Sequence, residues 1–218
     1  MAKSAAIHKK VSDLTISRLY VYLREAAELA RLNIRTISSA ELGERTALSA
    51  SQVRKDLSHF GQFGRSGAGY NIGELKSALE KILGKNRTWN VAVVGVGHLG
   101  SALLCYPGFK AHGLNIVAAF DADARKTGRQ IGGITIQPMA MMPKEVSRKN
   151  ISIGIITVPS KNAQGVANDL IDAGIECILN FAPASLIVTE HVKVKNVDFS
   201  RELETLSYFL VKNRQRRR

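Results

Sequence analysis

The residues best suited to chemistry in this sequence are three glycines that follow a short run of branched apolar residues. The run Val91–Val94 leads directly into the motif G-x-G-x-x-G, whose six residues are Gly95, Val96, Gly97, His98, Leu99 and Gly100. In a strand–turn–helix unit the first glycine allows a sharp turn, the second lets a pyrophosphate approach the backbone, and the third lets helix and strand pack closely. The spacing predicts the phosphate-binding turn of a dinucleotide site.

An acidic residue stands at the end of the next predicted strand, Ile116–Phe120. Asp121 follows this strand at the position where a carboxylate binds the adenosine ribose hydroxyls of NAD. Its charge would repel the additional phosphate of NADP, although Arg125 and Lys126 could weaken that preference. The two motifs favour NAD⁺/NADH as the cofactor. A domain that is unliganded, or that binds CoA, is the alternative.

A second group of polar residues lies on a predicted short helix in the first third of the chain. Capping boxes at Ser38–Glu41 and Ser49–Gln52 predict two helices separated by the turn Ala47-Leu48. The apolar positions predicted to pack inward are Ala50, Val53, Leu57 and Phe60. The polar positions predicted to face outward are Ser51, Gln52, Arg54, Lys55 and Ser58, and these residues together with Ser49 are predicted to contact DNA. Such a helix, set after a tight turn, suits the major groove, and an ordinary solvated helix pair is the alternative.

A glycine-rich segment, Gly61–Tyr70, follows these helices. Glycines permit a tight hairpin tip with positive φ, Phe63 and Tyr70 could anchor its two strands, and Arg65 would reach a minor groove or a phosphate from the tip. A phosphate-binding loop is the alternative, but the segment follows a helix and lacks the Gly-Lys-Ser/Thr ending of a P-loop. The pattern predicts a winged helix.

The remaining patterns predict an α/β chain with two domains and a C-terminal extension. Helical periodicity precedes a polar link at Gly84–Trp89, with an apolar stripe at Leu19, Leu23, Ala26, Ala27 and Ala30. After the link, β-branched runs alternate with helical patterns, as in a parallel sheet. Those runs are Val91–Val94, Ile116–Phe120, Ile151–Val158, Ile178–Phe181 and Val192–Val197. We expect a DNA-binding domain over 1–86, a Rossmann-like NAD(H)-binding domain over 87–200, and a helix with a basic tail over 201–218.

The net charge of +13 is concentrated at the two ends of the 218-residue chain. Residues 1–88 carry 15 basic and 8 acidic residues, and residues 212–218 carry five bases and no acid. A basic first third indicates a polyanionic partner. Two cysteines in apolar surroundings, Cys105 and Cys177, are expected to be buried and inert and fit a reducing cytoplasm. No run is long enough for a membrane span, and no metal-ligand spacing occurs.

An enzyme of this fold needs a substrate site with an acid–base group near the nicotinamide. The nucleotide-binding fold itself accounts for the residues after the link, so none are left for a substrate domain. The lone His191 is better explained as a structural residue. A cofactor with no reaction to perform is expected to act as a signal. A small NAD-dependent oxidoreductase with a basic extension, or a CoA-binding regulator, is the alternative.

Over nearly its whole length the chain resembles Rex, the bacterial family of redox-sensing transcriptional repressors. The matching motifs are Ser17–Tyr20, Gln52–Leu57, Gly67–Tyr70, Gly95–Gly100, Tyr106–Phe109, Asn180–Pro183 and Asn196–Phe199. The resemblance implies a homodimer that binds an inverted-repeat operator and is released when NADH replaces NAD⁺. One departure is the wing tip, where Arg65-Ser66 stands in place of two adjacent bases.

The resemblance also implies roles for single residues. Tyr106 and Phe199 would lie near the nicotinamide, Asp198 would pair with Arg24 in the DNA-competent state, and Arg54 and Lys55 would contact the major groove. The C-terminal helix, Arg201–Lys212, would be swapped onto the other subunit. The remaining residues expected in the cofactor site are Thr157, Val158, Pro159, Asn180, Phe181 and Ala182.

Overall fold

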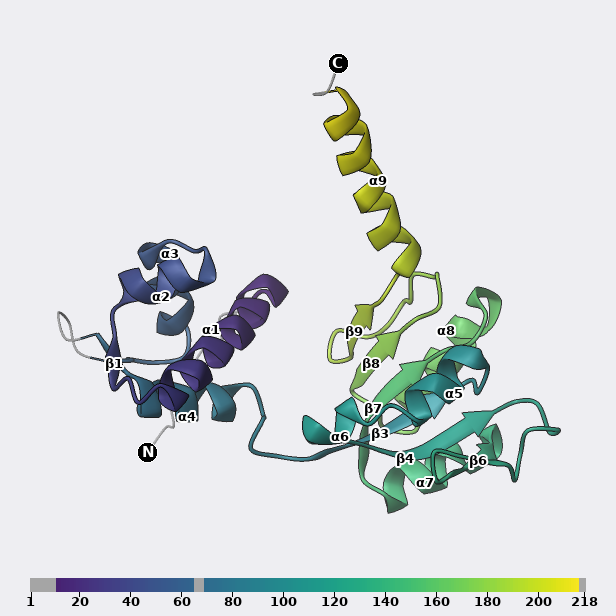
Figure 1. The fold of residues 1–218 in the computed structure, drawn as a ribbon. Coiled ribbons are helices and arrows are strands. Elements are labelled where there is room, and N and C mark those ends of the chain that lie inside the picture. Colours follow the sequence, from purple (N-terminus) through teal and green to yellow (C-terminus); the bar gives the residue numbers. More distant parts are fainter. Residues whose placement is uncertain (1–10, 65–68, 216–218) are drawn as a thin grey trace. The chain divides into compact units, whose positions relative to one another are not determined.

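The computed structural model describes residues 11–64 and 69–215, and its chain divides into two compact units, Met1–Arg87 and Thr88–Arg218 (Figure 1). The division falls inside the polar link at Gly84–Trp89, and Trp89 itself begins a strand. Among the described residues no helix is long and apolar enough to cross a membrane.

The first unit is a small helical domain whose helices begin at side-chain caps. Its elements are α1 (Asp13–Arg31), β1 (Thr36–Ile37), α2 (Ser39–Thr46), α3 (Ala50–Ser58), β2 (Tyr70–Asn71) and α4 (Ile72–Ile82). The side chains of Ser12, Ser38, Ser49 and Asn71 each accept a backbone N–H of the following helix. Such caps satisfy donors that the helix itself leaves free. The capping box predicted at Ser38–Glu41 is confirmed, whereas Ser49 caps α3 without a reciprocal bond from Gln52.

The buried face of α1 differs in part from the predicted stripe. Leu19, Leu23 and Ala26 are buried as expected. Ala30 is exposed, and the stripe instead includes Tyr22 and Leu29. Leu19, Tyr22, Leu23 and Leu29 share one core with residues of α2, α3 and α4. The larger Tyr22 and Leu29 bury more apolar area than alanines and therefore set the rotation of α1.

The predicted helix-turn-helix is formed by α2 and α3, with Ala47 in the left-handed conformation between them. The glycines of the following loop have positive φ as expected, at Gly61, Gly64 and Gly69. Phe63 and Tyr70 were predicted to anchor the two strands of one hairpin. In the structure Tyr70 begins β2, which pairs with β1, and Phe63 lies outside any described strand. Phe63 packs against the core of the unit instead. Arg65 lies outside the described residues.

The second unit is built on a parallel sheet, and its described elements follow in chain order. They are β3 (Trp89–Val94), α5 (His98–Leu104), α6 (Gly108–Ala111), β4 (Leu114–Asp121), β5 (Gln130–Ile131), β6 (Ile134–Pro138), the 3₁₀ turn η1 (Met139–Met141), α7 (Met142–Arg148), β7 (Ile151–Ile156), α8 (Ser160–Asp172), β8 (Cys177–Asn180), β9 (Lys193–Asn196) and α9 (Phe199–Gln215). The described strands are arranged β5-β6-β4-β3-β7-β8-β9, and every pair except β5–β6 is parallel.

This strand order is that of the dinucleotide-binding fold, because the chain winds outward from β3 in both directions. Alternate residues of β3 enter two cores, with Val91 and Val93 on one face and Ala92 and Val94 on the other. Both faces of the sheet are therefore covered, as the uninterrupted apolar run predicted. From β3 the chain passes to β4 and β6 on one side of the sheet and then returns to β7 on the other side. The carboxyl ends of β4 and β7 therefore lie on either side of the carboxyl end of β3.

Several details of the second unit correct the sequence expectations. The prediction did not include β5 and β6. Cys105 and Cys177 are exposed rather than buried. Burial of part of the Cys177 side chain, together with Glu176, raises the pKa of its thiol. Met142 is buried in the core.

The last helix, α9, is not buried by the part of the chain that the structure describes. It extends from Phe199 to Gln215, beyond the predicted span at both ends, and none of its residues is buried. In Figure 1 it continues from β9, and no other labelled element of the second unit runs beside it. Its large apolar side chains are each more than half exposed in the described chain.

Candidate functional site

The turn after β3 shows what each of the three glycines contributes. A Cβ on Gly95, whose φ is +94°, would lie 2.6 Å from Val158 Cγ1, and one on Gly100 would lie 2.2 Å from the Gly95 carbonyl oxygen. Gly97 differs, because its φ of −87° suits any residue and a Cβ there would meet nothing within 4 Å. The fold itself thus requires Gly95 and Gly100 but not Gly97. Open space above Gly97 is what a pyrophosphate approaching the backbone would need.

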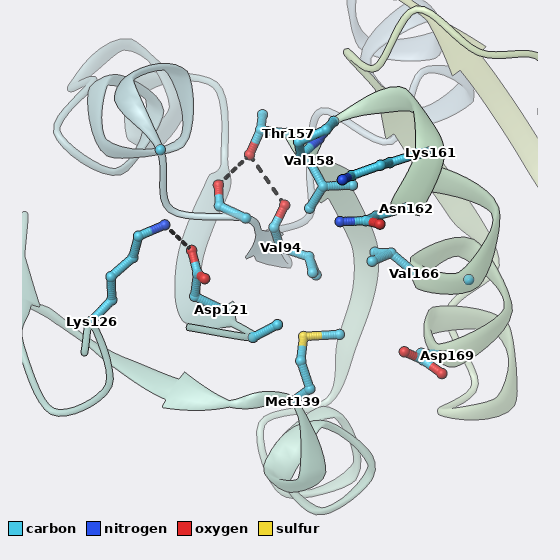
Figure 2. Close-up of a pocket in the computed structure, with 15 residues that line it drawn as sticks. Val94, Asp121, Lys126, Met139, Thr157, Val158, Lys161, Asn162, Val166 and Asp169 are labelled. Carbon is cyan, nitrogen blue, oxygen red and sulfur yellow. Dashed lines mark hydrogen bonds and ion pairs between the residues drawn. The ribbon is translucent and has the colours of Figure 1, made fainter. Parts of the chain in front are cut away.

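Asp121 ends β4 next to this turn, and its carboxylate has three partners, of which Figure 2 shows Lys126. Oδ2 accepts the Val96 N–H at 2.7 Å and the Lys126 ammonium at 2.8 Å, and Oδ1 accepts the Asp123 N–H at 2.9 Å. Burial opposes ionisation, but these donors outweigh it and lower the pKa of Asp121. The charged carboxylate holds the glycine turn in place and still faces the cavity beside it.

A cavity of about 860 Å³ opens at the carboxyl ends of β3, β4 and β7, the place where this fold binds ligands. Thr157 closes its inner wall, because its hydroxyl donates to the Gly95 carbonyl at 2.6 Å. Six predicted residues line the cavity: Gly95, Gly97, Asp121, Thr157, Val158 and Pro159. Lining residues that the site prediction did not include are Val94, Ala122, Lys126, Met139, Lys161, Asn162, Gly165, Val166 and Asp169.

Other predicted cofactor residues lie elsewhere in this unit. His98, Leu99 and Gly100 lie on α5, and Val96 is buried beside Asp121. Asn180 is fully buried, and its amide bonds the Ala182 backbone and the Asn196 side chain. Its hydrogen-bonding groups thus connect β8, β9 and the loop that contains Ala182.

The two aromatic residues expected near the nicotinamide do not line this cavity. Tyr106 is 57% exposed and lines a separate cavity of about 470 Å³, where its ring contacts Phe109 edge-on with centroids 5.1 Å apart. Phe199 is also 57% exposed, at the start of α9, and its ring lies 5.8 Å from that of Phe181. The described chain therefore leaves both aromatic faces open to further contacts.

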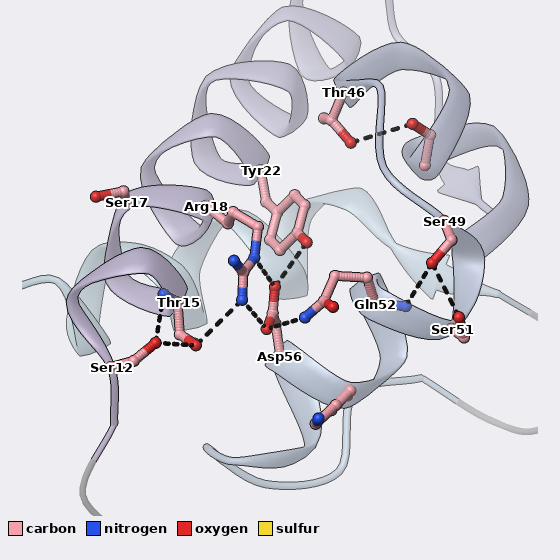
Figure 3. A network of polar contacts seen from close by, with 12 residues as sticks. Ser12, Thr15, Ser17, Arg18, Tyr22, Thr46, Ser49, Ser51, Gln52 and Asp56 are labelled. Atoms are coloured by element: carbon pink, nitrogen blue, oxygen red, sulfur yellow. Dashed lines mark hydrogen bonds and ion pairs between the residues drawn. The ribbon is translucent and has the colours of Figure 1, made fainter.

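The exposed face of α3 presents most of the residues predicted to contact DNA. Ser51, Arg54, Lys55 and Ser58 are exposed, and Ser49 caps the helix. Gln52 differs from the prediction, because its side chain turns inward and donates to Asp56 at 2.8 Å (Figure 3). Arg54 Nη1 donates to the Ser39 hydroxyl at 2.8 Å, so the guanidinium extends along the α2 side of the helix.

Asp56, which the sequence analysis did not single out, is the most buried charge of this unit among the described residues, with an exposed fraction of 1%. Arg18 of α1 donates to both of its oxygens, through Nε at 2.5 Å and Nη2 at 2.7 Å. The Tyr22 hydroxyl donates at 2.9 Å and Gln52 at 2.8 Å. Burial opposes ionisation, yet these bonds lower the pKa of Asp56 and leave it charged.

The predicted switch residues lie in different units. Arg24 is exposed on α1. Asp198 is exposed before α9, and its Oδ1 accepts the backbone N–H groups of Ser200 at 3.0 Å and Arg201 at 3.2 Å. Asp198 therefore caps α9. The Arg24–Asp198 pair stays a prediction.

A helix-turn-helix with a basic exposed helix, joined to a dinucleotide-binding fold with an open ligand cavity, defines a ligand-responsive DNA-binding regulator. Family models agree with this division: residues 10–58 match "Putative DNA-binding protein N-terminus" and residues 86–184 match "CoA binding domain".

Curated relatives identify the family. The chain is 46% identical over 91% of its length, and 96% of the relative, to a redox-sensing transcriptional repressor Rex of Carboxydothermus hydrogenoformans. It is 43% identical over 93% of its length, and 96% of the relative, to the Rex of Chloroflexus aurantiacus. The chain belongs to the Rex family of redox-sensing transcriptional repressors.

Solved structures agree with this assignment. The chain superposes with a TM-score of 0.87, at 39% identity and 95% coverage of both chains, on RSP in complex with β-NAD⁺ and operator DNA. It superposes with a TM-score of 0.81, at 37% identity and over 96% of this chain and 98% of the other, on RSP in complex with β-NADH. A further structure of RSP is described as a Rex-family repressor.

Proposed function

We propose that this chain represses transcription by binding an inverted-repeat operator through α3, and that NADH replacing NAD⁺ in the second unit releases it. The observation that carries the proposal is Gly97, which nothing in the fold requires to be glycine and which faces a cavity beside a charged, buried Asp121. The residues fit a dinucleotide, whose diphosphate the turn would hold and whose ribose the carboxylate would hold. Relatives solved with β-NAD⁺, β-NADH and operator DNA support the same cofactor and partner.

The second unit would bind NAD(H) in preference to NADP(H). A phosphate on the adenosine ribose would be placed next to the Asp121 carboxylate, and like charges at contact distance repel. Lys126 reduces that repulsion, because its ammonium already neutralises one carboxylate oxygen. The preference for NAD(H) therefore depends on both residues of the pair.

The active form would be a homodimer joined through α9. The helix places Leu203, Leu206 and Leu210 at i, i+3 and i+7, with exposed fractions of 58% to 65%. This spacing forms an apolar stripe along one side of a helix, and such a stripe is stable in water only when it is covered. A second copy would cover it by exchanging α9, and a dimer would present two α3 helices to the two halves of an inverted repeat.

Replacing Leu206 and Leu210 together with glutamate tests this dimer. We expect light scattering after size-exclusion chromatography to give the mass of one chain, with operator affinity reduced as two half-sites are no longer bound together. Glu204→Gln on the same helix is the control and should stay dimeric. If the double variant remains a dimer, α9 does not form the dimer interface.

The switch would depend on the nicotinamide end of the cofactor, which supplies no reaction here but differs in charge between its two forms. Tyr106 and Phe199 would favour the neutral reduced ring, and the accompanying shift of α9 would break the Arg24–Asp198 pair. Asp198→Asn tests the pair, because the amide keeps an oxygen for capping α9 but loses the charge. If release by NADH is unchanged in this variant, the ion pair is not the switch.

We further propose that the protein catalyses no reaction of its cofactor and acts in the cytoplasm. Incubation with NADH and candidate carbonyl substrates should leave the absorbance at the reduced-nicotinamide band unchanged. Sustained loss of that absorbance would instead favour a small oxidoreductase.

One titration tests the proposed function as a whole. The full-length protein is added to a fluorescent duplex selected from random sequence by the protein itself, and anisotropy is followed while NAD⁺ and NADH are varied separately. We expect NADH to dissociate the complex and NAD⁺ to preserve it, with CoA and NADPH having little effect. Binding that ignores both oxidation states would refute the proposal, and a response to CoA alone would favour the CoA-binding alternative.

A further inference from the structure

The first unit contains a buried ionic network that joins α1 to the exposed helix α3 (Figure 3). Asp56 lies on the inner side of α3 between Val53 and Leu57, both of which are buried. Arg18 and Tyr22 reach it from α1, and Gln52 reaches it from the preceding turn of α3. Thr15 extends the network, because Arg18 Nη2 also donates to its hydroxyl at 3.2 Å.

Stability alone does not account for a charge at this position. Replacing a buried ion pair by apolar side chains of similar volume is often neutral or stabilising, because removing charges from water costs as much as the pair returns. A carboxylate is also unfavourable in a basic unit that meets a polyanion, since it repels phosphates. Geometry is what the ion pair adds, because a guanidinium that donates to both carboxylate oxygens fixes an angle as well as a distance.

That angle matters for α3 because its outer face contains Ser51, Arg54, Lys55 and Ser58. Successive helical residues are offset by roughly 100°, so a small rotation of α3 moves these side chains out of register with base edges. Apolar contacts at Val53 and Leu57 resist separation of the helices but are not directional. The bonds to Asp56 are directional.

We propose that Asp56 is a positioning residue that, held by Arg18 and Tyr22, sets the rotation of α3 for sequence-specific reading of the operator. This inference rests on the proposed function. It predicts that the network contributes to specific binding and contributes little to non-specific binding, which depends on charge near the phosphates rather than on register.

The test compares the selected operator with a scrambled duplex of equal length, using anisotropy and the full-length protein at fixed salt. Asp56→Asn should weaken operator binding on the order of 10- to 100-fold and change scrambled-duplex binding by less than about 2-fold. The specificity ratio, which is the affinity for the operator divided by the affinity for the scrambled duplex, should therefore fall. Glu28→Gln on α1 is the matched control, because it removes the same charge from an exposed carboxylate. That control should leave the ratio unchanged and tighten both complexes slightly.

An electrostatic role and a positioning role of Asp56 predict opposite changes in operator affinity for Asp56→Asn. Removal of an acid alone would strengthen binding to both duplexes, whereas loss of positioning weakens binding to the operator. Equal weakening on both duplexes, or tightening, would overturn the proposal. If Asp56→Asn fails to unfold cooperatively on heating, Tyr22→Phe decides, because it removes one hydroxyl bond and keeps the ring. Tyr22→Phe should narrow the ratio by about 3- to 10-fold, and an unchanged ratio in this folded variant would also overturn the proposal.

The behaviour of the wild-type protein distinguishes failure of the proposed function from failure of the positioning role of Asp56. If the unaltered protein selects no operator or ignores NADH, the proposed function fails. If it does both and the variants keep its specificity ratio, only the positioning role fails.

Discussion

Substituting alanine for Gly97 should separate cofactor binding from folding. The φ of −87° at Gly97 suits alanine, and the added methyl group would meet no protein atom within 4 Å. Alanine at such a position restricts the unfolded chain, so we expect the free energy of unfolding to rise by about 0.4–1 kcal/mol. The variant should therefore be at least as stable as the wild type.

Binding of NADH should change in the opposite direction. The methyl group would occupy the space through which the diphosphate reaches the backbone amides of the turn. Hydrogen bonds to a charged group contribute about 1.5–3 kcal/mol each, so loss of one of them weakens binding by about 1.5–3 kcal/mol. That corresponds to a Kd weaker by roughly 10- to 150-fold. Fluorescence titration with NADH measures it directly.

Gly100→Ala is the contrasting variant, because its Cβ would lie 2.2 Å from the Gly95 carbonyl oxygen. Overpacking of this kind costs about 1–3 kcal/mol, so this protein should melt at a lower temperature even without ligand. Heating each variant with and without saturating NADH completes the assay, since a bound ligand raises the melting temperature. A stable Gly97→Ala protein that binds NADH as tightly as the wild type would refute the assignment of the turn as the diphosphate site.

Three further predictions test other parts of the chain. Asp121→Asn should weaken NADH binding by about 10-fold and reduce the preference for NADH over NADPH, because it leaves Lys126 without its charged partner. Competition titration measures both effects. Hydrogen bonds from Arg148 lower the pKa of Glu145 to about 2, so the stability that this carboxylate contributes is present above about pH 4.5 and lost as the pH falls toward 2. Urea unfolding should show this loss in the wild type and not in Glu145→Gln. Arg54→Ala should weaken operator binding by about 1–3 kcal/mol if it reads a base edge, measured by anisotropy.

The glycine turn and Asp121 could be predicted from the sequence because their geometry is local. Strand, turn and helix lie within sixteen consecutive residues from Trp89 to Leu104, and each glycine has a separate steric reason. Asp121 joins them because β4 pairs with β3 in parallel, which brings both carboxyl ends to one edge.

The opposite wall of the cavity could not be predicted in the same way. Lys161, Asn162 and Asp169 come from α8, which reaches the glycine turn because β7 lies beside β3. That adjacency depends on the order of the whole sheet. No residue pattern within α8 marks it as part of a ligand site.

The burial of polar residues could not be predicted from the sequence either. The apolar pattern of α3 correctly placed Val53 and Leu57 inside, but it gave no reason to bury Asp56 between them. Its partner Arg18 is 38 residues away in the chain. Only the packing of α1 on α3 shows that the charge is paired and that Gln52 turns inward.

The location of the cavity also limits where oxidation state can be sensed. Asp121 and the turn at Gly97 would contact the ribose and the diphosphate, which are the same in NAD⁺ and NADH. Groups that bind both forms equally cannot shift an equilibrium between two states of the protein. Discrimination must therefore come from residues at the nicotinamide end, and Tyr106 and Phe199 lie outside the described cavity and are largely exposed. Because Phe199 begins α9, covering α9 with a second copy would also constrain this ring, so assembly of the dimer and sensing of the cofactor would depend on the same helix.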